Sequence, residues 1–132
     1  MSLTDEERKT IVSLQLEKAH NNFDQIPLLC KVGYWDNVAN RLYYSLFHAV
    51  SALLIHDGHE VSSHRGAVSS FGQYYIVTGV FSIEDGRHYS RMQSLREKAD
   101  YNCTYYATEK DIFPKIEPTK QLIEKIELYI GK

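Results

Sequence analysis

The sequence predicts an all-α protein, an up-and-down bundle of four to five helices in a single domain over residues 1–132. Apolar residues recur at helical spacing through five segments, and capping residues and glycines separate these segments. No stretch alternates apolar and polar residues long enough to suggest a strand. The connections are short, which favours antiparallel neighbours. A chain of 132 residues can bury one hydrophobic core but is too short for two.

The first helix is expected to begin after Thr4, which can cap it, with acidic residues at 5–7 over the positive end of the helix dipole. Its apolar residues recur near the helical period: Ile11, Leu14, Leu16, Ala19, Phe23 and Ile26. Pro27 does not fit inside a straight helix. The first helix should therefore end between Asp24 and Leu29.

A second, central helix is expected over residues 35–56, because this stretch lacks Gly and Pro and is rich in Leu and Ala. Gly33 precedes it and Asp57-Gly58 closes it. Apolar residues fill most of its circumference: Leu42, Tyr43, Leu46, Phe47, Val50, Leu53 and Leu54. Such a helix should be covered by its neighbours on most sides.

A third helix should begin at Ser62 or Ser63, run through Val77 and end at Gly79. Its apolar side is formed by Ala67, Val68, Phe71, Tyr75 and Ile76.

The fourth helix should open at Ser82 or Asp85 and reach Tyr101. The fifth is expected from the cap Thr108 to Gly131, with an irregular start because two prolines fall in its first turns.

A line of polar residues runs along the apolar second helix. Arg41 and His48 lie two turns apart and point the same way, because each residue advances about 100° around a helix. Beside them lie Asn37, Tyr44, Ser45 and Ser51. An arginine and a histidine buried there would need counter-charges or a polar ligand. The line therefore predicts a site that faces a crevice or a partner.

Residues 40–49, Asn-Arg-Leu-Tyr-Tyr-Ser-Leu-Phe-His-Ala, resemble the signature helix of the HEPN family (higher eukaryotes and prokaryotes nucleotide-binding). The family carries an arginine and a histidine separated by four to six residues on one helix, and six residues separate Arg41 from His48. Ser-His-Arg-Gly at 63–66, followed by Phe71, and Arg-Glu-Lys-Ala-Asp-Tyr at 96–101 resemble elements of its small stand-alone prokaryotic branch. The resemblance covers most of the chain.

The resemblance implies a homodimer in which the second helices of two subunits meet, so that one cleft holds two copies of Arg41 and His48. Many family members are metal-independent ribonucleases, and several are toxins paired with a nucleotidyltransferase antitoxin. Arg41 and His48 are thus the expected catalytic residues of an endoribonuclease, because histidine exchanges protons near neutral pH and arginine holds phosphate oxygens. The expected contacts to RNA or a nucleotide are Asn37, Asn40, Tyr44 and Ser45.

Two other functions stay open. Family members that cut RNA usually carry a polar residue directly after the arginine, where this chain has Leu42. The chain could therefore be a non-catalytic module that binds a nucleotide or a nucleotidyltransferase, or a structural dimer without a ligand. Arg96 and Asp100, four residues apart, are expected to form an ion pair within their helix.

The composition excludes several classes. A net charge of -2 argues against broad, non-specific binding of nucleic acid but leaves room for a local basic cleft. Two cysteines are too few for a disulfide framework or a metal cluster. The loop group His56, Asp57, His59, Glu60 and His64 lacks a standard ligand spacing, so we expect neither metal nor cofactor. Without a leader or a long apolar run, we expect a cytoplasmic protein without membrane contact.

Overall fold

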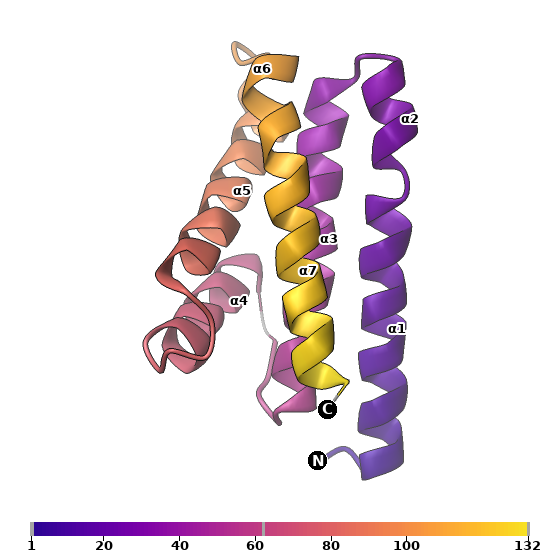
Figure 1. The fold of residues 1–132 in the computed structure, drawn as a ribbon, viewed down its shortest axis with the longest axis vertical. Helices are drawn as coiled ribbons and strands as arrows, with labels where there is room; N and C mark the ends of the chain where they lie inside the picture. Colours follow the sequence, from indigo (N-terminus) through magenta and orange to yellow (C-terminus); the bar gives the residue numbers. More distant parts are fainter. Residues whose placement is uncertain (1, 62, 132) are drawn as a thin grey trace.

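The computed structural model describes residues 2–61 and 63–131, and within these ranges it contains helices and turns but no strand (Figure 1). The elements are α1 (Asp5–Phe23), α2 (Ile26–Lys31), α3 (Trp35–His56), α4 (His64–Phe71), a π-helical turn η1 (Gly72–Ile76), α5 (Ile83–Tyr101), α6 (Glu109–Ile112), a 3-10 turn η2 (Phe113–Lys115) and α7 (Ile116–Ile130). The predicted all-α class is confirmed.

Four long helices run alternately up and down the molecule: α1, α3, α5 and α7 (Figure 1). The short α4 lies beside the lower half of α5. Helix α3 contacts α1, α2, α4, α5, α6 and α7, and is therefore the central helix that the sequence predicts.

The predicted helix starts depend on side-chain caps. Thr4 and Ser82 each form a capping box with the residue three positions on, and Thr108 accepts from the Asp111 backbone at 3.2 Å. Ser63 caps α4 by accepting from the Gly66 backbone at 2.9 Å. Ser62, the alternative cap, lies outside the described residues. Each cap satisfies a backbone N–H that has no partner within its helix, which fixes the first turn.

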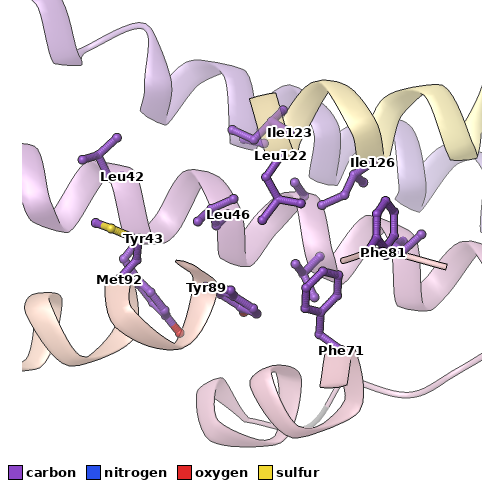
Figure 2. Packing of buried hydrophobic residues seen from close by; sticks show 14 of the residues in the cluster. Leu42, Tyr43, Leu46, Phe71, Phe81, Tyr89, Met92, Leu122, Ile123 and Ile126 are labelled. Carbon is purple, nitrogen blue, oxygen red and sulfur yellow. The ribbon is translucent and has the colours of Figure 1, made fainter. Parts of the chain in front are cut away.

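The hydrophobic core surrounds α3 (Figure 2). Many of its large members come from four helices and the loop before α5, and all of these are at most 8% exposed: Leu42, Tyr43, Leu46, Leu53, Phe71, Phe81, Tyr89, Met92, Leu122, Ile123 and Ile126. Helix α1 packs mainly against α3, so only a narrow stripe of it is covered. Val12 is buried, whereas Leu14 is 53% exposed, and its prediction as part of the apolar side of the first helix is wrong.

His88 links α5 to α7 inside the bundle. Its Nε2 lies 2.8 Å from the Thr119 hydroxyl oxygen, which itself donates to the Lys115 carbonyl. The imidazole therefore donates to Thr119 and stays neutral. Burial, with smaller effects of Arg91 and Lys115, lowers its pKa to about 4.

This pKa predicts that the protein loses stability in mild acid. Below pH 6.5 the unfolded chain protonates His88 while the folded chain does not, so we expect a loss of about 2 kcal/mol between pH 7 and pH 5. Urea unfolding across this range should show a smaller loss for His88→Gln, which keeps a donor for Thr119 but does not titrate. Equal slopes for the two proteins would contradict the prediction.

Candidate functional site

One side of α3 is left open by the rest of the bundle. Between residues 37 and 55, every α3 residue that keeps solvent exposure lies within an arc of about 120° on the helical wheel. We call these residues the open face: Asn37, Asn40, Arg41, Tyr44, Phe47, His48 and Ile55. The predicted polar line thus coincides with the uncovered side of an otherwise buried helix.

Arg41 is held in place by two amides. Its Nε donates to Asn40 Oδ1 at 3.0 Å, its Nη2 donates to the same oxygen, and its Nη1 donates to Asn22 Oδ1 of α1 at 2.7 Å. Three of the five guanidinium N–H groups are thereby occupied and two remain. Amides do not neutralise the positive charge, and no carboxylate of the described residues pairs with Arg41. The guanidinium is therefore oriented and still able to bind an anion.

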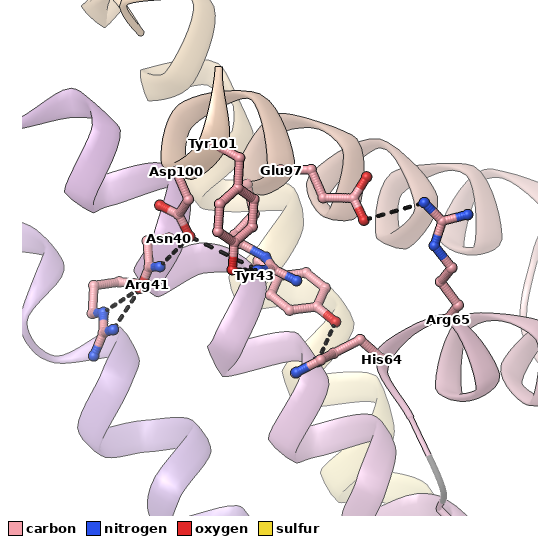
Figure 3. Close-up of polar contacts among 9 residues, drawn as sticks. Asn40, Arg41, Tyr43, His64, Arg65, Glu97, Asp100 and Tyr101 are labelled. Atoms are coloured by element: carbon pink, nitrogen blue, oxygen red, sulfur yellow. Dashed lines mark hydrogen bonds and ion pairs between the residues drawn. The ribbon is translucent and has the colours of Figure 1, made fainter. Parts of the chain in front are cut away.

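Asn40 connects Arg41 to α5 (Figure 3). Its Nδ2 donates to Asp100 Oδ2 at 2.9 Å, while its Oδ1 receives the guanidinium. Asp100 also pairs with the buried Arg96 at 3.9 Å, which confirms the expected ion pair. Asn40, predicted to contact a ligand, thus has both ends of its amide engaged with protein groups, and it positions Arg41.

His48 lies two turns further along the same face. Its Nδ1 is 2.7 Å from Gln15 Oε1 of α1, and because an amide oxygen only accepts, Nδ1 carries the proton. Burial lowers the pKa of His48, and Lys18, His64 and Arg41 lower it further. The imidazole is therefore neutral at pH 7, with a lone pair on Nε2 that can accept a proton.

The remaining predicted site residues divide into two groups. Tyr44 is half-buried and its ring lies beside the Arg41 guanidinium, 5.9 Å from the centroid, while Asn37 is exposed at the start of the face. Ser45 is fully buried, and its hydroxyl donates to the Arg41 carbonyl at 2.7 Å. Because Ser45 is fully buried, it does not lie on the open face, and its contact to a ligand stays a prediction.

Several residues of the site were missed by the sequence reasoning. His64, at the start of α4, lies with its Nδ1 2.9 Å from the Tyr43 hydroxyl and its ring 4.5 Å from that of Phe47. Gln15 and Asn22 of α1 hold His48 and Arg41. The sequence holds a signal for Gln15 and Asn22. They are seven residues apart on their helix, as Arg41 and His48 are on theirs, and two antiparallel helices place two pairs of equal spacing opposite each other.

The loop group that resembles a metal site is dispersed. Asp57 accepts from the hydroxyls of Tyr75 at 2.6 Å and Tyr129 at 2.8 Å and contacts His56 Nδ1, so it ties the end of α3 to η1 and α7. The His59 ring stacks on Tyr74 at 3.7 Å, away from this carboxylate network. Within residues 2–61 and 63–131, no three His, Cys, Asp or Glu side chains converge as metal ligands would. In the same ranges, no helix is both long and apolar enough to cross a bilayer.

The fold and the site define a small helical-bundle protein with an arginine and a histidine on the open side of its central helix. The family model of the HEPN domain matches residues 12–129, and the chain therefore belongs to the HEPN domain family.

Three relatives cover nearly the whole chain. A "UPF0332 protein" of Thermotoga maritima is 31% identical over 124 residues, which span 94% of each chain. "Putative toxin MJ0605" of Methanocaldococcus jannaschii is 25% identical over 131 residues, 99% of this chain and 92% of the relative. A "UPF0332 protein" of Archaeoglobus fulgidus is 29% identical over 121 residues, 92% and 90% of the two chains. The likeness thus extends from end to end.

Proposed function

We propose that this protein is a toxin-like HEPN ribonuclease that binds RNA as a homodimer and cleaves it without a metal ion. The observation that carries the proposal is the open face of α3. On it, Arg41, which has no paired carboxylate among the described residues, and a neutral His48 lie two turns apart on the same side of the helix, and residues of α1 fix their orientations. The relative from Methanocaldococcus jannaschii that matches 99% of this chain is named "Putative toxin", which supports a toxin-like role for this chain.

The chemistry calls for two histidines. His48 Nε2 accepts the proton of a ribose 2′-hydroxyl as its oxygen attacks the neighbouring phosphorus. A second, protonated imidazole gives its proton to the departing 5′-oxygen, leaving a 2′,3′-cyclic phosphate and a free 5′-hydroxyl. The two free N–H groups of Arg41 hold the charge of the five-coordinate phosphorus.

A homodimer supplies the second histidine. The open face combines the half-buried rings of Tyr44 and Phe47 with the polar groups of Arg41 and His48, a mixture typical of a surface that is partly covered by a partner. A twofold axis beside α3 would bring the partner's His48 and the partner's Arg41 into the same cleft. One subunit then provides the base and the other the acid.

A phosphate-binding module that does not cut RNA is the second candidate. It is favoured by one observation, that Leu42 after Arg41 is fully buried in the core, so no polar side chain follows the arginine on the open face. In that case the bundle would bind a nucleotide or a nucleotidyltransferase, and Arg41 would only hold phosphate.

Incubation of the purified protein with structured RNA in excess EDTA tests the proposal. We expect cleavage by the wild type, products ending in cyclic phosphate, and a dimer at micromolar concentration in sedimentation velocity. RNA that stays intact while it binds would favour the second candidate. A monomer at every accessible concentration would exclude the shared cleft.

A further inference from the structure

A polar pocket of about 660 Å³ opens at the lower end of the open face, between α1, the last turns of α3 and the loop at 58–61. Its walls include Arg8 and Gln15 from α1, Phe47 and Ser51 from α3, and His59 and Glu60 from the loop. The start of α1 and the end of α3 lie at the same end of the bundle, as Figure 1 shows. The pocket has the volume of a site for one small organic ligand.

The pocket contains a polar group whose burial is otherwise unexplained. Ser51 is 1% exposed, and its hydroxyl has no hydrogen-bond partner among the described residues. Ser45, an earlier serine on the same helix, instead donates its hydroxyl to a carbonyl of that helix. A buried hydroxyl without a partner costs free energy, and a ligand that bonds to it would recover that cost.

The pocket is continuous with the proposed RNA site. Gln15 lines it and also holds His48 through Oε1, so its Nε2 remains to donate to a ligand. The Phe47 ring lies 5.4 Å from the ring of His48 and forms another wall. On the α1 side, Arg8 donates to the Ile55 carbonyl at 2.6 Å, which holds its charged end at the pocket. An aromatic wall, a free amide and a free hydroxyl are the groups that recognise a nucleobase.

We infer that this pocket is a nucleobase subsite, in which a base stacks on Phe47 and bonds to Ser51 and Gln15 while its phosphate lies at Arg41 and His48. The inference rests on the proposed function, because the pocket would bind the base of the same nucleotide whose phosphate binds at the proposed RNA site. The chemistry of the base is the same in a free nucleotide and in RNA.

Equilibrium binding to the full chain tests the subsite. The probes are inorganic phosphate, ribose 5-phosphate, the four nucleoside monophosphates, and a short RNA with and without one base removed. We expect at least one monophosphate, or the intact RNA, to bind about tenfold tighter than its counterpart without the base. A base effect in the RNA alone would assign the subsite to RNA, and an effect with the monophosphates would extend it to free nucleotides.

Variants locate the base. Phe47→Leu removes the stacking surface, and Ser51→Val removes the hydroxyl and puts methyl groups in its place, so each should abolish most of the tenfold difference. Phe113→Leu is the matched control, because Phe113 is 56% exposed on η2 and lies outside the pocket. Thermal unfolding of each variant shows whether it is folded. If one of the two pocket variants does not fold, the other still tests the subsite.

The outcomes separate the subsite from the proposed function. Equal binding of a nucleotide and ribose 5-phosphate overturns the subsite alone. A base effect that survives in both Phe47→Leu and Ser51→Val places the base elsewhere and also overturns it. No binding of any phosphate or RNA probe overturns the proposed function and the subsite together.

Discussion

His48→Ala is expected to lower the rate of RNA cleavage at least about 100-fold, because it removes the acid and the base of the proposed dimer in a single substitution. The Gln15 hydrogen bond places the proton of the neutral imidazole on Nδ1 and leaves Nε2 as the acceptor, a role that an alanine side chain cannot fill. Single-turnover cleavage in EDTA measures the effect.

His20→Ala is the matched control for this variant. His20 lies on α1, is exposed, and pairs with Glu127 at 2.6 Å rather than with the open face. The control should cleave within about twofold of the wild type. Equal rates for His48→Ala and the wild type would assign any cleavage to another site or to a contaminant.

The same proposal fixes the direction of the pH dependence. Cleavage needs one neutral and one protonated His48, and this combination is most abundant when the pH equals the pKa of the residue. Burial and the nearby positive charges hold that pKa below 6.5, so the rate should be highest on the acid side of pH 6.5. A cleavage rate that is highest above pH 7 would contradict the lowered pKa of His48 or its proposed role as acid and base.

Local sequence signals predicted most of the fold. The starts of α1, α4, α5 and α6 lie at the predicted caps because a hydroxyl or carboxylate reaches the backbone of the next turn without help from the rest of the molecule. Leu14 could not be placed, because its exposure depends on how much of α1 its neighbours cover. The π-helical turn at Gly72–Ile76 was also not predicted, since its apolar spacing differs little from that of an α-helix.

The candidate site was predicted only in part, for a related reason. The helical wheel placed Arg41 and His48 on one side of α3, and this depends only on their own helix. Their holders Asn22 and Gln15 depend on the register between α1 and α3, which core packing decides. Asn40 reaches Arg41 although it is the adjacent residue, because a long guanidinium side chain can fold back across the helix surface.

A substitution of Leu42, the residue directly after Arg41, is expected to have a large effect on stability. Family members that cut RNA usually carry a polar residue there, but in this chain Leu42 is fully buried in the core. Leu42→Asn should therefore cost about 3 kcal/mol in the free energy of unfolding, because it removes buried apolar surface and buries an amide without a partner. Urea denaturation measures the loss, and Leu128→Asn, at a position that is 63% exposed, should change stability by only about 0.5 kcal/mol.

A second variant, at Asn40, belongs to the same test. Asn40 directly precedes Arg41 in the sequence, whereas Leu42 follows it, and the Asn40 side chain accepts a hydrogen bond from Arg41. Asn40→Ala should keep the fold within about 1 kcal/mol but weaken RNA binding about tenfold, since Arg41 then retains only Asn22 and its guanidinium becomes mobile. If Leu42→Asn instead folded normally and raised cleavage, a polar side chain at position 42 would be able to reach the site in this chain as well. If Asn40→Ala bound RNA as tightly as the wild type, Asn40 would not be the residue that orients Arg41. The two variants together distinguish two interpretations of the buried Leu42. Either the site has lost its activity with the polar residue after Arg41, or Asn40, the residue before Arg41, orients the arginine instead.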